Sequence, residues 1–214
     1  MTQKERQERS RREILRAAME EFGTHGYDSV SMENICTRHG ISKGMMYHYF
    51  SNKDDLFLLC VKDVFQRLQE EIEQRAAPLE EQDAIESIQG FFMIRESYFQ
   101  QHPHRKLIFE TALLRPPRHL AEQIHTLRGP IRELNRQFLV RTVSRLPLRD
   151  GLSPDQAIRY LECLNTYFWP AAVQYQRDTP IQDTHSMLQA AEEIVNLALF
   201  GIARRQQDFF GNIE

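Results

Sequence analysis

The sequence predicts an all-α protein, with an N-terminal three-helix domain followed by a larger helical domain and about nine helices in all. Apolar residues recur at helical spacing from Ile14 to Phe22 and again along residues 182–207. No segment alternates apolar and polar residues between turn signals, which is the pattern typical of strands. Hydrophobic residues make up 41% of the 214 residues, so the chain can bury a sizeable core.

The first two helices are bounded by residues that favour helix ends. The first is expected over about residues 5–25, where the apolar run closes at Gly23 and Gly26. Ser31 is placed to cap a short second helix, because a serine oxygen accepts a hydrogen bond from a free amide of the first turn. That helix should stop before Gly40.

The third and fourth helices also begin at capping residues. Ser42 is expected to cap a very short helix from Lys43 to Tyr49. Asn52 caps the fourth helix, whose first turn holds Asp54 and Asp55, where the helix dipole favours negative charge. Further helices are expected at about residues 52–75, 81–101, 104–114, 118–146, 154–177 and 182–207, with breaks near Pro78 and at Gly129 and Pro130.

The second and third helices are joined by His39–Ser42, in the arrangement of a helix-turn-helix. Gly40 suits the turn because glycine adopts a positive φ without Cβ strain. Ile35, Ile41 and Met46 can meet beneath the turn and fix the angle between the helices. In this motif the second helix lies in the major groove of DNA.

The charge of the chain is unevenly distributed. The formal net charge is −3, but residues 1–53 carry 9 Lys and Arg against 7 Asp and Glu, whereas residues 54–214 carry 18 against 23. The acidic excess therefore lies away from the predicted helix-turn-helix. The N-terminal basic residues fit either a DNA-binding arm or an ordinary solvated helix face, and they are Lys4, Arg6, Arg9, Arg11, Arg12 and Arg16.

Catalytic and metal sites lack their usual signatures in this sequence. Cys36, Cys60 and Cys163 are far apart and show no CxxC or Cys/His spacing, so neither a disulfide framework nor a zinc site is expected. His102 and His104, in an expected loop, have no carboxylate or thiolate at ligand spacing. No motif of nucleophilic, nucleotide-binding or metalloprotease enzymes is present, so we expect no enzyme and no cofactor.

The sequence also gives no sign of a membrane segment. The N-terminus is charged where a signal peptide would be apolar, and no apolar run approaches the roughly 20 residues that cross a bilayer. A cytoplasmic location is therefore expected.

The third predicted helix and the residues after it carry side chains suited to DNA. Lys43 can reach a guanine edge or a phosphate, Gly44 permits close approach of the backbone, and His48 can face bases or backbone. The side chains with donors suited to phosphate oxygens are Tyr47, Tyr49 and Lys53.

The wider sequence around this motif is more specific. The segments Phe22–Tyr27, Ser31–Ile35, Gly40–Gly44 and Tyr47–Leu56 together strongly resemble the N-terminal domain of the tetracycline-repressor (TetR) family. Aromatic, glycine and lysine positions agree in register over about residues 10–58, near a quarter of the chain. The remainder is similar to the family only in being helical.

The resemblance implies a role for each matching position. It places Tyr47, Tyr49 and Lys53 on phosphates, and the residues from Lys43 to Met45 with His48 against base edges. Met45 departs from the small or hydroxylated residue common in the family, so an apolar contact with DNA is expected there. Met46 and Phe50 should be core. The full expected DNA-binding set is Ser42, Lys43, Gly44, Met45, Tyr47, His48, Tyr49 and Lys53.

The resemblance also implies a DNA-binding domain at residues 1–51 and an effector-binding and dimerisation domain at residues 52–214. In the latter, aromatic residues could line a pocket for a mostly apolar small molecule, although each taken singly is more simply explained as core. The expected ligand-binding residues are Phe92, Tyr98, Phe99, Phe109, Phe138, Tyr167 and Trp169.

The last two predicted helices are expected to form a homodimer. Residues 182–207 carry apolar residues on two adjacent stripes, a face too wide to be covered within one subunit. A two-fold dimer would read double-stranded operator DNA as an inverted repeat with half-sites about 34 to 36 Å apart or somewhat more.

These features favour a sequence-specific transcriptional regulator, a repressor released from its operator by a small-molecule effector. The alternative is a helical protein-interaction adaptor without specific DNA binding, which fits the acidic balance of residues 54–214.

Overall fold

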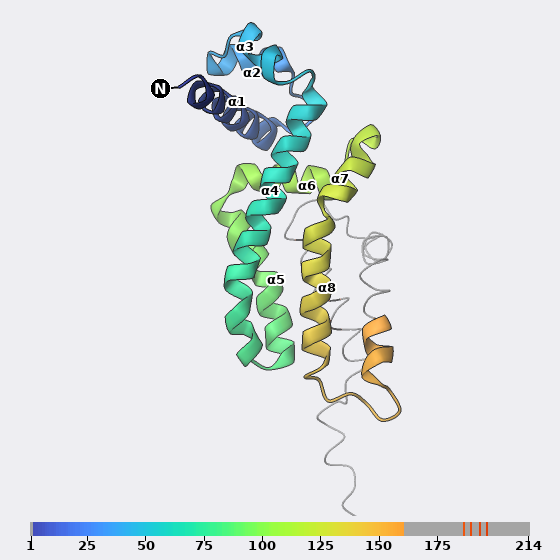
Figure 1. Cartoon of the computed structure of the whole chain (residues 1–214). Helices are drawn as coiled ribbons and strands as arrows, with labels where there is room; N and C mark the ends of the chain where they lie inside the picture. Colours follow the sequence, from blue (N-terminus) through green and yellow to red (C-terminus); the bar gives the residue numbers. More distant parts are fainter. Residues whose placement is uncertain (1, 161–185, 187–188, 190–192, 194–195, 197–214) are drawn as a thin grey trace, which may run out of the picture. The chain divides into compact units, whose positions relative to one another are not determined.

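A computed structural model describes residues 2–160 and the single residues 186, 189, 193 and 196. Residues 2–160 form helices joined by turns and contain no β-strand (Figure 1), so the expected all-α class is confirmed. The expected helix at 154–177 is described only over 154–160, after Ser153, whose hydroxyl accepts a hydrogen bond from the Gln156 amide at 3.2 Å. The expected dimer-forming helix 182–207 lies outside the described segments.

The first helix, α1 (Gln3–His25), begins slightly before its expected start. Thr2 and Glu5 form a reciprocal capping box: the Glu5 amide donates to Thr2 Oγ1 at 3.2 Å, and the Thr2 amide donates to the Glu5 carboxylate at 2.7 Å. The helix continues through Gly23 and ends at Gly26, whose φ is 72°. The helix end expected at about residue 25 is therefore confirmed, and Gly23, inside the last turns of α1, serves a close helix contact.

The next three helices match the expected caps closely. They are α2 (Met32–His39), α3 (Lys43–Tyr49) and α4 (Lys53–Ala76). The Asn52 side chain accepts a hydrogen bond from the Asp55 amide at 2.9 Å, as expected of a cap for α4.

The segment after α4 contains more elements than the sequence predicts. Its elements are η1 (Ala77–Glu81), α5 (Ala84–Gln101), α6 (Pro103–Leu114), η2 (Arg118–Leu120), α7 (Ala121–Leu127) and α8 (Gly129–Val143). The break expected at Gly129 and Pro130 is confirmed as the junction of α7 and α8. The helix expected over residues 104–114 is confirmed as α6. Pro103 opens it as a first-turn proline, so the separate placement of His104 in a loop is wrong.

The chain divides into two compact units. One comprises Met1–Glu71 and Ser97–Pro130, and the other comprises Ile72–Glu96 and Ile131–Glu214. The expected division into a DNA-binding domain at residues 1–51 and an effector-binding and dimerisation domain at residues 52–214 remains a prediction.

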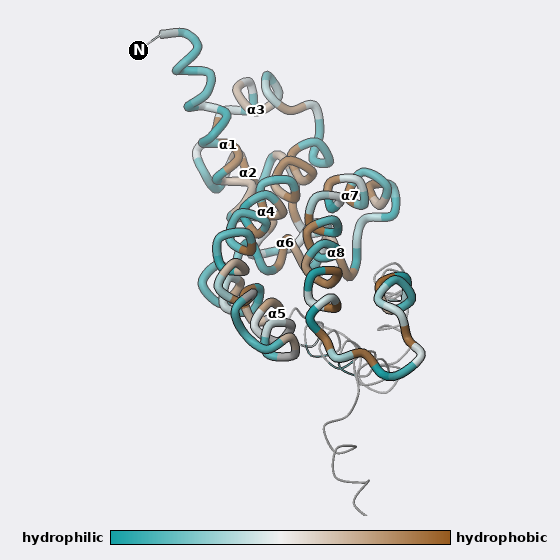
Figure 2. Tube along the Cα trace, turned by 60° about the horizontal axis from the view of Figure 1, so that its bottom comes forward, coloured by the Kyte–Doolittle hydropathy of each residue, from teal (hydrophilic) through white to brown (hydrophobic). Residues whose placement is uncertain are grey.

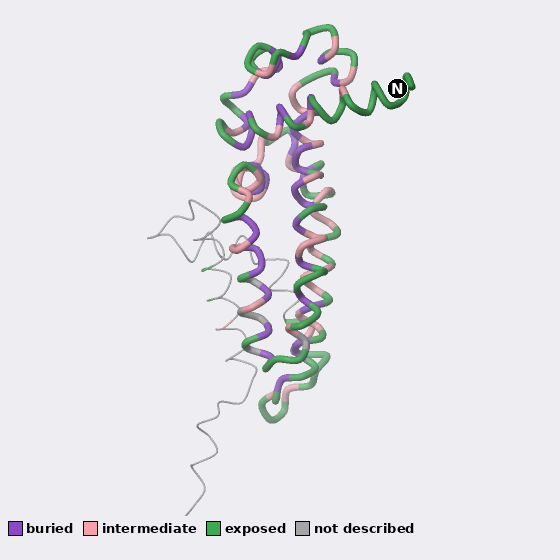
Figure 3. Tube along the Cα trace, turned by 90° about the vertical axis from the view of Figure 1, so that its left-hand side faces the viewer, coloured by how far each residue is buried: buried purple, intermediate pink, exposed green. Residues whose placement is uncertain are grey.

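The first unit has a core built from both of its chain segments. Figure 2 shows α1 hydrophilic at its start and hydrophobic further along, and Figure 3 shows the same first turns exposed. The largest fully or almost fully buried side chains of this unit include Ile14, Phe22, Ile35, Met46, Leu56, Phe57, Leu68, Phe99 and Ile108.

Candidate nucleic-acid interface

The helix-turn-helix is held by local hydrogen bonds at each helix end. The Asn34 amide donates to Ser31 Oγ at 3.1 Å, and the Met45 amide donates to Ser42 Oγ at 3.1 Å. Gly40 ends α2 in the left-handed conformation with a φ of 65°, which an L side chain rarely adopts. These caps fix where α3 starts, and therefore which of its side chains point away from the protein.

The core beneath the turn is apolar, as expected. Ile35 and Met46 are 0% exposed and Ile41 is 4% exposed. Phe50, expected to be core, is also buried at 6% exposure. Because α3 is so short, the burial of Met46 orients the whole helix.

The other side of α3 is open to solvent. Ser42, Lys43, Gly44, Tyr47 and His48 are exposed, and a Cβ built on Gly44 would meet nothing within 4 Å. The three remaining residues of the expected DNA-binding set are partly exposed, and they are Met45, Tyr49 and Lys53. The structure therefore brings the set together around one short helix.

Tyr47 has a partner that the sequence did not indicate. Its hydroxyl donates a hydrogen bond to Glu33 Oε1 of α2 at 2.9 Å. A backbone amide hydrogen bond and the one from Tyr47 lower the pKa of Glu33, whereas the hydrogen bond to Glu33 raises the pKa of Tyr47. At neutral pH a negative charge therefore stands beside the expected phosphate donor.

Lys53 is also engaged within the protein. Its Nζ donates to the Tyr27 carbonyl oxygen at 3.1 Å and stands 4.0 Å from the centre of the Tyr27 ring. An ammonium over an aromatic face is attracted by the ring quadrupole. Tyr27 was not predicted as a site residue, and its position in the motif segment Phe22–Tyr27 was the only sequence signal.

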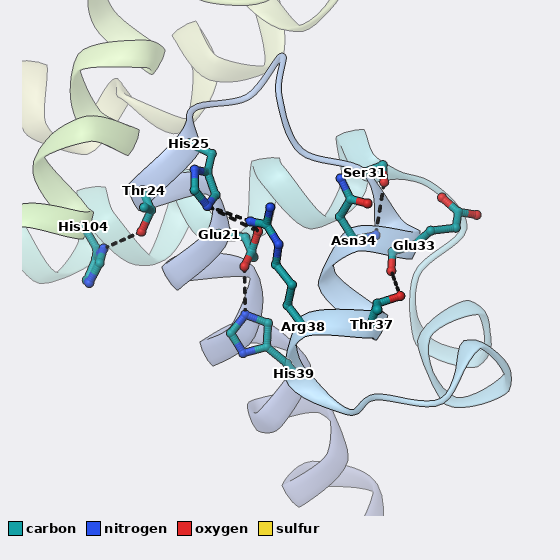
Figure 4. Close-up of polar contacts among 10 residues, drawn as sticks. All are labelled: Glu21, Thr24, His25, Ser31, Glu33, Asn34, Thr37, Arg38, His39 and His104. Atoms are coloured by element: carbon teal, nitrogen blue, oxygen red, sulfur yellow. Dashed lines mark hydrogen bonds and ion pairs between the residues drawn. The ribbon is translucent and has the colours of Figure 1, made fainter.

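A buried carboxylate joins α1 to the end of α2. Glu21, 6% exposed, accepts from Arg38 Nη1 at 2.8 Å and lies 3.2 Å from His39 Nε2 (Figure 4). His25 Nε2 lies 2.7 Å from the same Arg38 nitrogen. This arrangement, which sequence reasoning missed, fixes α2 against α1 and so supports the platform on which α3 stands.

The N-terminal basic residues lie on a largely exposed stretch of helix. Residues 2–9 and 11–13 of the α1 region are exposed (Figure 3), and Arg12 Nε donates to the Glu8 carbonyl at 3.3 Å. A DNA-binding arm and an ordinary solvated helix face would both be exposed, so the role of these basic residues in DNA binding remains a prediction.

The expected ligand-binding aromatics fall in different places. Tyr98, Phe99 and Phe109 belong to the first compact unit, where the Phe99 and Phe109 ring centres lie 4.6 Å apart. Phe138 belongs to the second unit and stacks on Phe91 with 3.8 Å between ring centres. The Phe92 side chain, Tyr167 and Trp169 lie outside what the structure describes.

Among these aromatic residues, Tyr98 has a buried hydroxyl group. Its side chain is 5% exposed, yet its hydroxyl has no hydrogen-bond partner among the residues that the structure describes. Burial raises the pKa of Tyr98 to about 12, so the hydroxyl keeps its proton and remains a donor at neutral pH.

None of the helices formed by the described residues is long and apolar enough to cross a bilayer. Within the same residues, no group of three or more His, Cys, Asp or Glu side chains could hold a metal ion.

Curated relatives match the N-terminal part of the chain. The transcriptional regulator HbdR of Aromatoleum sp. is 34% identical over 65 residues, 30% of this chain and 28% of HbdR. The transcriptional repressor AcnR of Corynebacterium glutamicum is 32% identical over 65 residues, 30% of this chain and 35% of AcnR. The transcriptional activator FasR of Mycolicibacterium smegmatis is 31% identical over 114 residues, 52% of this chain and 51% of FasR. The matches thus span between about a quarter and a half of these relatives.

Solved structures share the fold over most of the chain. The fatty acid degradation regulator FadR from Bacillus halodurans matches with a TM-score of 0.60 and 17% identity, covering 92% of this chain and 97% of that one. SmeT, solved as a complex with triclosan, matches with a TM-score of 0.57 and 20% identity, covering 92% of this chain and 93% of that one. At these identities the likeness concerns the fold.

The family comparison agrees with the geometry of the helix-turn-helix. Residues 14–60 match the family model of the bacterial regulatory proteins of the tetR family, a segment that contains the caps, the turn and the whole of α3. Over residues 14–60 the chain therefore carries a domain that matches the N-terminal domain of the bacterial regulatory proteins of the tetR family.

Proposed function

We propose that this protein is a sequence-specific DNA-binding transcriptional regulator that places α3 in the major groove. The observation that carries the proposal is the exposed face of α3, on which Lys43, Tyr47 and His48 stand free of the core while Met46 on the same helix is buried. A capped, rigidly seated short helix with donors on its outer side meets the geometric need of reading base edges.

The expected contacts divide into two kinds. Lys43 and His48, at the start and end of α3, reach base edges and determine sequence preference. Tyr47, Tyr49 and Lys53 bind phosphates and set position and salt dependence. Gly44 adds no side chain, which leaves room for the DNA backbone or a base beside the helix.

The protein acts as a homodimer on an inverted repeat. The support is the double apolar stripe of residues 182–207, which one subunit cannot cover, and the symmetry that a dimeric reader imposes on its operator.

A small-molecule effector controls release from DNA, and the protein is a repressor that acts in the cytoplasm by binding and not by catalysis. Tyr98 supports this, because its buried hydroxyl is a donor with no partner among the described residues, and its ring packs on Phe99, which in turn packs on Phe109. SmeT, a protein of the same fold, has been solved in complex with triclosan.

The decisive experiment is selection of bound sequences from a random double-stranded DNA pool by the full-length protein. An inverted repeat is expected. Recovery of unselected sequences only would contradict specific recognition and would favour the protein-interaction adaptor.

The effector part is tested separately, by titrating the protein with an effector found in a small-molecule screen, with and without the selected operator. Coupling of about 5- to 150-fold between the two ligands is expected, and linkage requires operator DNA to weaken effector binding by the same factor. Equal effector affinities in both titrations would exclude release by allostery.

A further inference from the structure

Four side chains meet at the N-terminus of α4. We name this group the α4 cluster, and its members are Tyr27, Lys53, Asp54 and His119. All four belong to the same compact unit. Tyr27 comes from the turn after α1, Lys53 and Asp54 are the first residues of α4, and His119 lies in η2.

Lys53 takes its position from Tyr27. One of its three N–H donors binds the Tyr27 carbonyl at 3.1 Å, while the ammonium lies 4.0 Å from the centre of the same ring. No described residue accepts a hydrogen bond from the other two donors, so they can bind a phosphate or water. A shift of Tyr27 would therefore move the ammonium that we expect on the DNA backbone.

Tyr27 is in turn fixed by packing and by Asp54. Its ring is 8% exposed and lies 4.9 Å from the Phe57 ring, measured between centres. Its hydroxyl donates to Asp54 Oδ1. Burial and this hydrogen bond raise the pKa of Tyr27, and the same hydrogen bond lowers the pKa of Asp54, so at neutral pH a neutral phenol donates to an ionised carboxylate.

His119 holds the second oxygen of that carboxylate. Its Nε2 lies 2.9 Å from Asp54 Oδ2 and 3.4 Å from the Tyr27 hydroxyl oxygen. The histidine can donate to Asp54 as a neutral ring or as a cation. Its side chain is 58% exposed and Asp54 is 35% exposed, so this contact orients the carboxylate more than it stabilises the fold.

We propose that His119 is a positioning residue for DNA binding: through Asp54 it fixes Tyr27, and thereby sets the place of the Lys53 ammonium next to the recognition helix. The inference rests on the proposed DNA-binding function and adds a regulatory route to it. Residues 97–130 include η2. A displacement of that segment would therefore move Asp54, at the start of α4, through its contact with the His119 side chain. Because the Lys53 ammonium is expected to contact a phosphate and not a base, a displacement of His119 should change affinity for all DNA sequences alike.

The first test compares the affinity of three variants for the selected operator. His119→Ala removes the donor and should weaken binding by about fivefold or more, the lower range of ordinary coupling. His119→Gln should restore most of the affinity, because its amide N–H can stand near the place of Nε2 and bind Asp54 again. His125→Ala, the same substitution at an exposed position of α7, should bind as the wild type does. Wild-type affinity of His119→Ala, or equal weakness of the alanine and glutamine variants, would overturn the inference.

The second test asks whether His119 acts through Lys53. In a double-mutant cycle, His119→Ala should have little further effect once Lys53→Ala has removed the ammonium. Full additivity of the two losses would mean that His119 affects DNA binding by another route, and would overturn the proposal.

The third test needs no DNA and so separates this inference from the proposed function. Amide hydrogen exchange in the first turn of α4 and in the turn after α1 should become about fivefold faster in His119→Ala than in the wild type and His119→Gln. Unchanged exchange would overturn the inference even where DNA binding proved real. Failure of the wild type to bind any selected DNA, with faster exchange in His119→Ala, would overturn the proposed function and leave the positioning of the α4 cluster established.

Discussion

Gly23 of α1 lies directly against the backbone of His104 in α6. A Cβ built on Gly23 would stand 2.5 Å from the His104 Cβ and 2.6 Å from its carbonyl oxygen, closer than real atoms approach. Beside this contact, Thr24 Oγ1 and His104 Nδ1 lie 3.3 Å apart (Figure 4). The absent side chain of Gly23 therefore allows α1 and α6 to meet.

Replacing Gly23 with alanine should force these helices apart. Because the atoms in the way belong largely to backbone, we expect Gly23→Ala to lower the free energy of unfolding by about 1 to 3 kcal/mol, despite the better helix propensity of alanine. Urea denaturation followed by circular dichroism measures the change.

Gly44→Ala provides the matched control in α3, where a Cβ meets nothing within 4 Å. It should raise the free energy of unfolding by about 0.5 to 1 kcal/mol, whereas Gly23→Ala lowers it. Gly44→Ala should also weaken DNA binding, because its new methyl group stands on the exposed side of α3. Equal stability changes in the two variants would contradict the close contact between α1 and α6.

The buried carboxylate of Glu21 should contribute to the stability of the helix-turn-helix. Glu21→Gln removes the charge that Arg38 and His39 face while keeping the size of the side chain. We expect a loss of about 1 to 3 kcal/mol, limited because Arg38 is 52% exposed and can be solvated by water. Glu20→Gln, at the exposed neighbouring position of α1, should change stability by less than about 0.5 kcal/mol. Equal effects of the two substitutions would show that Glu21 makes no special contribution.

Glu33 should restrain DNA binding, because it accepts a hydrogen bond from the Tyr47 hydroxyl and carries a negative charge where phosphates are expected. Glu33→Gln should increase affinity for all DNA sequences about two- to fivefold at 0.1 M salt, since salt and water screen the repulsion between an exposed carboxylate and the phosphates. Glu20→Gln makes the same change of charge on α1 and should have a smaller effect. The measurement is fluorescence anisotropy with selected and random duplexes, and weaker binding by Glu33→Gln would mean that this carboxylate itself assists recognition.

Asp54 should make the protein sensitive to acid. The Tyr27 hydrogen bond lowers the pKa of Asp54 in the folded protein. Asp54 therefore stabilises the fold above the pKa of an unfolded Asp, about 3.9. This contribution is lost as the pH falls through the lower pKa of the folded state. Asp54→Asn should therefore lose less stability than the wild type between about pH 5.5 and pH 3. Melting temperatures at these two pH values test this, with Asp55→Asn in the same turn as control. An identical acid loss in wild type and Asp54→Asn would rule out the contribution.

The two lysines of the expected DNA surface should act differently. Lys43→Ala should cost about 1 to 3 kcal/mol of binding free energy mainly at particular base pairs, as should His48→Ala. Lys53→Ala should weaken all sequences alike and reduce the salt dependence of binding by about one phosphate contact. Competition among single-base operator variants measures this difference in sequence dependence. If Lys43→Ala weakened binding to all variants equally, Lys43 would not be a base-reading residue.

The sequence by itself determined the elements whose causes are local. Ser31, Ser42 and Asn52 cap their helices through bonds to amides three residues ahead, and Gly40 ends α2 through its own backbone conformation, so each signal lies within a few residues of its effect. The exposed side of α3 follows from helical periodicity once Met46 is placed in the core.

Only the tertiary structure decided the contacts between distant segments. In sequence Gly23 only marks where the apolar run of the first helix closes, whereas in the fold it lies against His104, 81 positions later. Lys53 reads as a free phosphate donor, but the fold places it over Tyr27 and ties its neighbour Asp54 to His119. No local pattern encodes such pairs, because they exist only when packing of the apolar core brings separate elements within hydrogen-bond distance.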